Sequence, residues 1–490
     1  MKKQTFYFGL FMFAVFYAAS CFTDRLGNVE PTALKMVGLI VLMAIFWLGE
    51  AIPLAATSII PLFALPMLGI MSSKDVATAY GANIIWLFMT GFFIARAIEK
   101  WGLHRRIANY IISTVGFSPS RLVGGFLIST AAISCFISNT ATALMMLPIG
   151  LSVLKAIGPQ LKQSKKAFGT ALMLAIAFGA NIGGMGTPIG SPPNLIFLGV
   201  LQESFPTLRE ISFATCVAIA LPIVVCFLAL TWFYLLKTNP VLNLKAQGEF
   251  KLADLGPMSR GEMLVGILFA IAVILWMTRA DINLGSFTVT GWASALGLSK
   301  FVKDTVVGAL ICVALFTITV RNLENKKIPL LDWETAKQIP WDILLLFGGG
   351  IALSKGIVAS GLSASFADRL EFGLKGLPTI VEIMVLCAFV TFLTEITSNT
   401  AMTSLMMPIL AVISPLLDID PALLMMPAAL SASCAFMFPV ATPPNAIVYS
   451  QNYFSIATMA KTGLTLNIIG VILVSFGVFF LGNALQIMGS

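Results

Sequence analysis

The chain has 490 residues, of which 58% are hydrophobic and 11% are charged. Soluble proteins carry roughly 25% charged residues. This composition therefore excludes an ordinary soluble domain and predicts an all-α polytopic membrane protein, because its apolar stretches are long enough to cross a bilayer. The formal net charge is +8, but the bases lie between the apolar stretches, where they indicate membrane topology rather than a nucleic-acid partner.

The sequence offers few residues suited to covalent or metal chemistry. The seven cysteines are scattered through apolar sequence without a CxxC pair, which is typical of small buried hydrophobic side chains. His104 is the only histidine, so a multi-histidine metal centre is excluded. No nucleophile–base pair and no phosphate-binding glycine loop is visible. We therefore expect neither an enzyme nor an ATP-driven pump.

The chain begins with a basic pair, Lys2 and Lys3, before an apolar run over residues 6–19. This pattern fits a cleavable signal peptide or a retained first helix, and the many spans that follow favour the helix. Composition divides the chain into an N-terminal helix and loop (1–32), a first repeat (33–236), a polar cytoplasmic linker (237–260) and a second repeat (261–490). Further apolar spans are expected at 33–50, 54–70, 77–112, 167–182, 211–236, 263–277, 302–320, 342–361, 423–438 and 464–485.

A small polar triplet interrupts the apolar sequence once in each half. Ser138-Asn139-Thr140 recurs as Ser398-Asn399-Thr400, 260 positions later, and a Met-Met pair and a proline follow each copy. The limbs beside the first triplet, 122–137 and 141–154, would be roughly 21–24 Å long as helices, which is short of the roughly 30 Å hydrocarbon core. Each triplet therefore predicts the turn of a re-entrant hairpin that ends inside the membrane.

A broken helix follows each hairpin. Residues 183–194 contain four glycines and three prolines, which no α-helix tolerates, and residues 439–445 repeat their Pro-Pro-Asn ending. Such a break inside a bilayer needs protein or a water-filled cavity to satisfy its backbone. The order hairpin, broken helix, terminal span occurs in both halves, and the first-half unit holds an odd number of crossings, which predicts that the second unit is inverted. The basic loops place the N-terminus in the cytoplasm and the C-terminus outside.

The hairpins and breaks carry the chemistry of an ion site. Helix N-termini, expected at Ala141 and Ala401, have a partial positive charge and free N–H groups that suit a carboxylate. Freed carbonyls with serine and asparagine oxygens suit Na⁺. Because residues 122–154 contain no Lys, Arg or His, bound Na⁺ would supply the counter-charge for an anion. Glu395, just before the second triplet, fits either a proton-coupling carboxylate or a structural hydrogen-bonded group.

The motifs together resemble a known family. Both triplets, Gly186-Thr187-Pro188 with Ser191-Pro192-Pro193-Asn194, and Ala441-Thr442-Pro443-Pro444-Asn445 resemble the divalent-anion:sodium symporters, the INDY-type di- and tricarboxylate transporters. The resemblance covers nearly the whole chain. It implies about eleven transmembrane helices and two re-entrant hairpins in an inverted repeat. It also implies a homodimer of the elevator type, in which a hairpin-bearing transport domain moves against a scaffold domain.

The resemblance also implies two Na⁺ sites and one anion site. One Na⁺ would meet Ser134, Ser138, Asn139 and the backbone at Gly186. The other would meet Thr394, Thr397, Asn399 and the backbone at Ala441. The carboxylates of the substrate would meet Asn139, Thr140, Asn399, Thr400 and Pro443.

We therefore expect a secondary active transporter in the plasma membrane that carries C4-dicarboxylates such as succinate, malate and fumarate into the cell by symport. Na⁺ would be the coupling ion, and no other cofactor is expected. A Na⁺-independent dicarboxylate or citrate exchanger and a sulfate carrier would fit the same fold. An ion channel is the candidate from another class, but no repeated selectivity-filter sequence is visible.

Overall fold

The computed structural model describes residues 2–21, 30–157, 164–208, 210–239, 255–283, 288–321, 326–362 and 378–484. Most of these residues are helical, and eight of the described helices are long and apolar enough to cross a membrane, with shorter apolar helices beside them. The protein is thus a multi-pass α-helical membrane protein, as the composition predicts. Most of the predicted linker at 237–260 lies outside the described residues.

The helices of the first half follow the predicted order. The N-terminal helices are α1 (Lys2–Ala19), α2 (Pro31–Leu48), α3 (Leu54–Thr57), α4 (Ile60–Met67), α5 (Ser73–Tyr80), α6 (Asn83–Trp101) and α7 (Leu103–Val115). The first hairpin and the helices after it are α8 (Pro119–Ser134), α9 (Asn139–Ile157), α10 (Lys165–Gly184), α11 (Pro192–Ser204) and α12 (Phe213–Thr238).

The second half repeats the hairpin and the broken helix. Its helices are α13 (Arg260–Arg279), α14 (Trp292–Ala295), α15 (Asp304–Thr317), α16 (Trp333–Ala336), α17 (Trp341–Ala359), α19 (Thr379–Thr394), α20 (Asn399–Leu416), α21 (Pro421–Ser431), α22 (Pro443–Tyr449) and α23 (Ile456–Ala484). Two short antiparallel ribbons, which the sequence analysis did not predict, pair β1 (Ile282–Asn283) with β2 (Thr288–Val289) and β3 (Thr319–Arg321) with β4 (Lys327–Pro329).

Local backbone chemistry explains two interruptions near the N-terminus. α2 ends at Leu48, and α3 begins directly after Pro53, as expected for a residue that cannot continue a helix. The apolar stretch predicted at 77–112 is three helices rather than one. α6 ends at Trp101, and the next residue, Gly102, has a left-handed backbone with φ of 74°, a conformation that glycine adopts without a steric penalty. The chain therefore turns there into α7.

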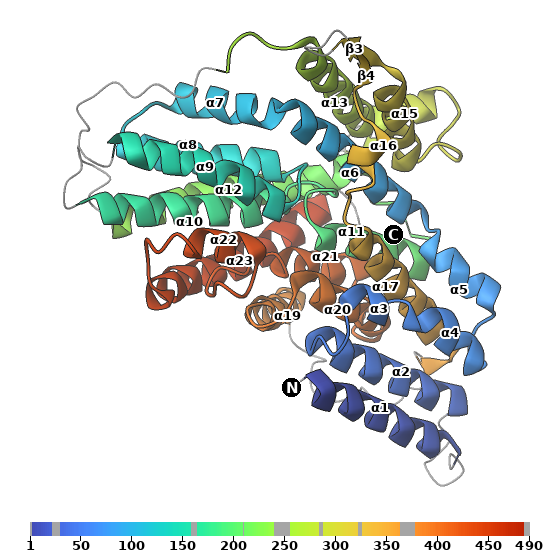
Figure 1. Cartoon of the computed structure of the whole chain (residues 1–490). Coiled ribbons are helices and arrows are strands. Elements are labelled where there is room, and N and C mark those ends of the chain that lie inside the picture. Colours follow the sequence, from blue (N-terminus) through green and yellow to red (C-terminus); the bar gives the residue numbers. More distant parts are fainter. Residues whose placement is uncertain are drawn as a thin grey trace.

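We divide the described helices into two sets that share extensive contacts, since α7 packs on α8 and α17 packs on α11 and α20. The core module comprises residues 119–238 and 379–484, in which α8 packs on α10, α12 on α23, and α19 on α21 and α23. The peripheral helices comprise residues 2–115 and 260–359, in which α1 packs on α2 and α6 on α15. Figure 1 shows α22 and α23 beside α10 and α12, although they come from opposite halves of the chain. The two hairpins thus belong to one packed unit.

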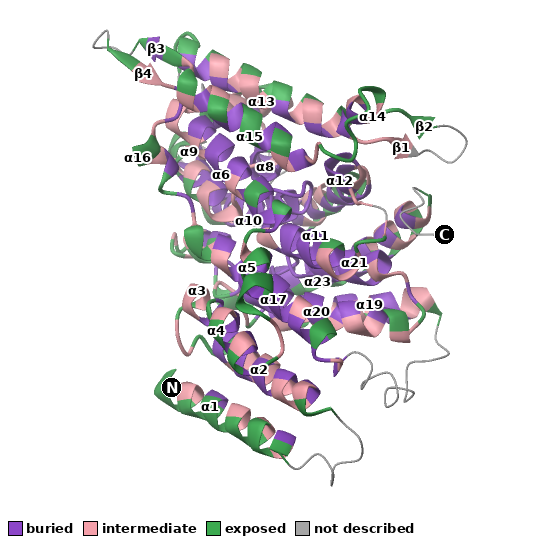
Figure 2. Ribbon diagram, turned by 90° about the vertical axis from the view of Figure 1, so that its right-hand side faces the viewer, coloured by how far each residue is buried: buried purple, intermediate pink, exposed green. Residues whose placement is uncertain are grey.

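Burial places α10 at the centre of the core module. Every residue of α10 from Phe168 to Gly184 is buried, whereas α12, α13 and α23 leave many of their apolar side chains exposed (Figure 2). In a bilayer such apolar faces contact lipid. The first helix break therefore lies deep inside protein, which is the setting that irregular backbone requires in a membrane.

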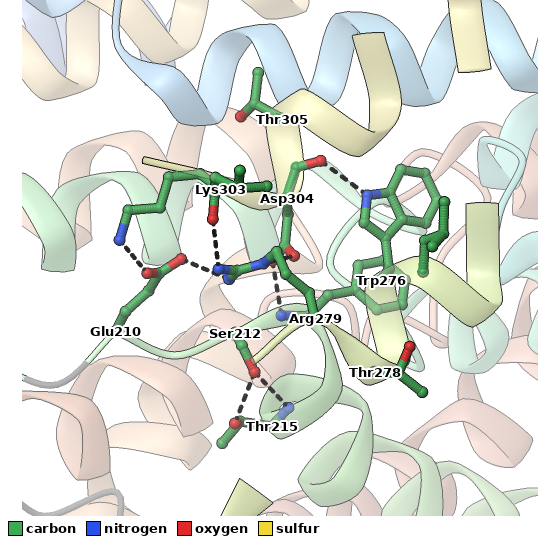
Figure 3. Close-up of polar contacts among 12 residues, drawn as sticks. Glu210, Ser212, Thr215, Trp276, Thr278, Arg279, Lys303, Asp304 and Thr305 are labelled. Atoms are coloured by element: carbon green, nitrogen blue, oxygen red, sulfur yellow. Dashed lines mark hydrogen bonds and ion pairs between the residues drawn. The ribbon is translucent and has the colours of Figure 1, made fainter. Parts of the chain in front are cut away.

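A partly buried charge network ties the core module to the peripheral helices (Figure 3). Arg279, at the end of α13, donates to Asp304 at 2.5 Å and to Glu210 at 2.9 Å, and its side chain is only 3% exposed. Lys303 also contacts Glu210, at 2.5 Å. Asp304 in turn accepts the N–H of Phe213 at 3.0 Å, which anchors the start of α12. A cavity of about 250 Å³ adjoins this network and reaches Pro188 in the first break.

Candidate ion and anion site at the two hairpin turns

Both hairpin turns start a helix at the asparagine of the triplet. α9 begins at Asn139 and α20 at Asn399, two residues before the starts expected at Ala141 and Ala401. The reason is local, because the serine hydroxyl of each triplet accepts the N–H of the alanine three residues later, at 3.4 Å in both turns. The serine thus acts as an N-cap. The asparagine and threonine lie in the first helical turn, where backbone N–H groups have no helical partner and favour anions.

The last residue of each first limb reaches across the turn to the asparagine. Ser134 Oγ donates to Asn139 Oδ1 at 2.8 Å, and Thr394 Oγ1 donates to Asn399 Oδ1 at 2.6 Å. Both hydroxyl-bearing residues are fully buried. The structure therefore brings together two pairs of the predicted cation ligands, one pair in each half.

Each of these hydroxyls also contacts a broken helix. Ser134 Oγ donates to the carbonyl of Ala180 on α10 at 2.7 Å, and Thr394 Oγ1 donates to the carbonyl of Ala432, just past α21, at 3.2 Å. Both halves thus gather the same three kinds of oxygen, namely a hydroxyl, an amide oxygen and a backbone carbonyl. Neutral oxygens of these kinds are the ligands of hard cations.

Three carbonyl oxygens converge on Gly190 in the first break. A Cβ atom placed on Gly190 would lie 2.7 Å from the carbonyl oxygen of Gly184, 2.9 Å from that of Cys135 and 3.1 Å from that of Ser134. Glycine is therefore the residue that leaves these oxygens room. Gly190 lies two residues before the proline that begins α11, and Ala441 lies two residues before the proline that begins α22. The sequence analysis missed Gly190, although this shared spacing would have found it.

The backbone position predicted at Gly186 also lies against the first hairpin. A Cβ atom on Gly186 would be 2.9 Å from Cys135 Sγ. The Cys135 thiol donates to the carbonyl of Gly183 at 3.2 Å, and the Thr187 hydroxyl donates to the carbonyl of Cys135. The turn and the break are therefore held together by polar contacts on both sides of Gly186.

The other predicted residues differ in exposure. Thr397 donates its hydroxyl to the carbonyl of Leu393 at 2.9 Å, so this side chain is engaged within its own turn. Ala441 is buried, whereas Pro443 is exposed. The remaining predicted residues are partly exposed: Ser138, Asn139, Thr140, Asn399 and Thr400.

Glu395 fastens the second break to the second hairpin. Its Oε1 accepts the N–H groups of Phe436 at 2.7 Å and Met437 at 2.9 Å, and its Oε2 accepts that of Phe438 at 3.2 Å. Asn467 on α23 adds a fourth hydrogen bond at 2.8 Å. These contacts explain why α21 ends at Ser431, seven residues before the apolar run does, because the carboxylate replaces the helical acceptors. They support a structural role for Glu395.

Asn181 on α10 joins the two halves at their breaks. Its Nδ2 lies 3.2 Å from the carbonyl of Ala435, 3.1 Å from the hydroxyl of Thr442 and 3.3 Å from Oδ1 of Asn445. A second contact across this junction links the hydroxyls of Ser191 and Ser433 at 3.3 Å. The sequence analysis did not single out Asn181. The only signal was an asparagine in an otherwise apolar helix.

Comparison with known proteins places the chain among membrane transporters. Residues 5–488 match the family described as the sodium:sulfate symporter transmembrane region. The chain is 39% identical over 486 residues to a Staphylococcus saprophyticus protein named sodium-dependent dicarboxylate transporter SdcS, and the match covers 96% of this chain and 91% of that protein. The protein of the same name from Staphylococcus aureus strain bovine RF122 is also 39% identical, over 89% of this chain and 84% of its own length.

A solved structure shares the fold. It is that of Neisseria gonorrhoeae MtrF, described as illuminating a class of antimetabolite efflux pumps. The likeness has a TM-score of 0.53 and 12% sequence identity, and it covers 94% of this chain and 97% of that one.

Proposed function

Because this chain belongs to the sodium:sulfate symporter family, we propose that it couples the movement of Na⁺ to the uptake of dicarboxylates, with C4 acids such as succinate, malate and fumarate as substrates. The two relatives named as sodium-dependent dicarboxylate transporters support this choice. The protein would be a secondary active transporter of the plasma membrane, with a cytoplasmic N-terminus and an external C-terminus.

The observation that carries the proposal is the pair of matching oxygen clusters at two helix N-termini. Ser134 with Asn139, and Thr394 with Asn399, present neutral oxygens beside the first turns of α9 and α20. A dianion at these N-termini would gain from the helix dipoles but would meet no fixed cation between residues 122 and 154. Two Na⁺ ions in the oxygen clusters would supply the missing positive charge, which makes Na⁺ and anion binding interdependent.

Each predicted residue has a role in this scheme. Ser134, Ser138, Asn139 and the backbone near Gly186 would hold one Na⁺. Thr394, Thr397, Asn399 and the backbone at Ala441 would hold the other. Asn139, Thr140, Asn399, Thr400 and Pro443 would contact the carboxylates. The core module would carry the ions and the substrate across the membrane against the peripheral helices of a homodimer.

Uptake into liposomes tests the function. The purified protein is reconstituted, and labelled succinate uptake is measured under an inward Na⁺ gradient and under equal gradients of K⁺ or choline. We expect strong uptake with Na⁺ alone, competed by malate and fumarate. Uptake that needs internal dicarboxylate but no Na⁺ would instead identify an exchanger. Competition by sulfate alone would identify a sulfate carrier, and competition by citrate alone would identify a citrate transporter.

A further inference from the structure

Asn181 links the first oxygen cluster to the second break. It is fully buried on α10 and directly follows Ala180, whose carbonyl accepts the Ser134 hydroxyl of the first cluster at 2.7 Å. Its side chain contacts the second break. Asn181 therefore adjoins the first cluster through its backbone neighbour, and its amide contacts the second break, which continues from the Ala432 carbonyl of the second cluster.

The partners of Asn181 Nδ2 are all acceptors of the second break. The carbonyl of Ala435, the hydroxyl of Thr442 and Oδ1 of Asn445 surround it at 3.1–3.3 Å, so the amide can be placed only with its NH₂ toward them. Thr442 directly follows Ala441, where the second Na⁺ would meet the backbone. Asn445 holds the carbonyls of Ala435 and Phe438 at 3.1 and 3.0 Å, so the break is held as one unit.

The other end of the same amide is not satisfied. Asn181 Oδ1 is buried and has no hydrogen-bond partner among the described residues. An unpaired buried amide oxygen is destabilising, and an aliphatic side chain would avoid that cost in an otherwise apolar helix. The NH₂ contacts with the second break are thus the only polar interactions that its side chain makes in the described structure.

We propose that Asn181 is a positioning residue that couples the two Na⁺ sites, an inference that rests on the proposed function. The Ser134 hydrogen is shared between Asn139 Oδ1 and the Ala180 carbonyl. Na⁺ bound to Asn139 Oδ1 would repel that hydrogen, which then goes to Ala180 alone. The stronger hydrogen bond to the Ala180 carbonyl displaces the backbone next to Asn181. The Asn181 amide then passes this displacement to Thr442 and its neighbour Ala441. Filling one site thereby favours filling the other.

The test is a Na⁺ titration of the purified protein without substrate. The midpoint of thermal unfolding is measured as Na⁺ replaces K⁺ at constant ionic strength. For the unaltered protein we expect a stabilisation curve with a Hill slope above 1. For Asn181→Ala the slope should fall to about 1, and the Na⁺ concentration for half of the effect should rise at least about fivefold, the lower end of typical coupling between sites.

A second variant guards against a folding defect. Thr442→Val leaves Asn181 in place but removes one of the acceptors of its amide. It should lower the Hill slope of the Na⁺ stabilisation curve in the same way as Asn181→Ala. Thr231→Val is the matched control, since Thr231 is fully buried on α12 and its hydroxyl has no described partner. Its curve should match that of the unaltered protein. A residue with only a packing role would lower the midpoint at every Na⁺ concentration and leave the slope unchanged.

The outcomes separate this inference from the proposed function. An unchanged slope in Asn181→Ala and Thr442→Val, a slope of 1 in the unaltered protein, or a flattened slope in Thr231→Val as well would each overturn the coupling role. A cooperative, Asn181-dependent Na⁺ curve in a protein that takes up no succinate would leave the coupling intact and refute only the proposed substrate.

Discussion

Asn139 and Asn399 each offer one amide group to both Na⁺ and the substrate under the proposed function. Each amide oxygen already accepts a buried hydroxyl, from Ser134 or from Thr394, so its position is fixed before any ligand binds. We expect Asn139→Ala or Asn399→Ala to raise the Na⁺ and the succinate concentrations for half-maximal uptake together, each about tenfold, which corresponds to about one polar contact. Uptake kinetics measured against both ligands check this. An unchanged Na⁺ dependence in both variants would show that the ligands do not share these residues.

Substitution of Glu395 distinguishes a structural role of this residue from a role in proton coupling. Its carboxylate accepts three backbone N–H groups and the Asn467 amide. In Glu395→Gln an NH₂ group must face one of these donors, so we expect the free energy of unfolding to fall by about 2–3 kcal/mol. Na⁺-driven uptake should persist with an unaltered pH profile. Loss of uptake in a variant of normal stability would instead support proton coupling.

Asp332 adds a pH-dependent contribution to stability outside the membrane spans. A hydrogen bond from Lys100 at 2.7 Å, assisted by the N–H of Thr335, lowers the pKa of this carboxyl from 3.8 to about 2. A lowered pKa in the folded state means that the contribution is complete above pH 4 and is lost as the pH falls from about 4 to 2. The unaltered protein should therefore lose its stability advantage over Asp332→Asn across this window. Unfolding midpoints of both proteins from pH 7 to pH 2 test this, and a constant difference would contradict it.

At the scale of elements, the polar triplets made the hairpin turns predictable, and glycine and proline made the breaks predictable. The positions of the two turns and of the first break followed from short limbs and from a dense run of helix-breaking residues. The early end of α21 did not, because it depends on Glu395, which comes 41 residues before Phe436 in the chain. The start of α20 was misplaced for a smaller reason, since Ser398 caps this helix and moves its first residue to Asn399. Contacts between distant segments, such as that of Asn181, leave almost no trace in a single sequence.

The fit between the first turn and the first break depends on Gly190. In Gly190→Ala the new methyl group would lie 2.9 Å from the Cys135 carbonyl oxygen and 3.1 Å from that of Ser134, so the break and the hairpin must separate. We expect Na⁺-driven uptake to fall at least about tenfold, in line with the cost of overpacking a buried site. Gly81→Ala is the matched control, because its nearest neighbouring atom would lie 3.8 Å away. Equal uptake by the two variants would show that the carbonyl cluster at Gly190 is not part of the site.

At the scale of the whole molecule, one acid at the end of α11 and one between α11 and α12 bind the core module to the peripheral helices. Glu203 pairs with Lys355 of α17 at 2.8 Å, and Glu210 pairs with Arg279 and Lys303. Beside the first of these pairs, the hydroxyls of Ser204 and Ser354 lie 2.6 Å apart. If the core module moves during transport, these contacts must separate in every cycle.

A reversible cross-link tests that motion. In a background without the exposed Cys21 and Cys226, Ser204→Cys with Ser354→Cys should be bridged by Hg²⁺. Uptake should then stop and should return when a thiol removes the metal. The control pair is Ser455→Cys with Thr458→Cys, whose hydroxyls lie 3.0 Å apart at the start of α23, and its bridging should leave uptake unchanged. Continued uptake by the bridged first pair would rule out movement of the core module against α17.

The contacts of Asn181 also have a consequence for biosynthesis. Its three partners come 254 to 264 residues later in the chain. At a synthesis rate of about 5–20 residues per second, α10 is complete about 13 to 50 s before the segment that receives its amide. During that interval the first hairpin and the first break already exist, but the carbonyls of the second break do not. The first half of the chain must therefore wait in the membrane with the amide of Asn181, on its central apolar helix, still without these partners.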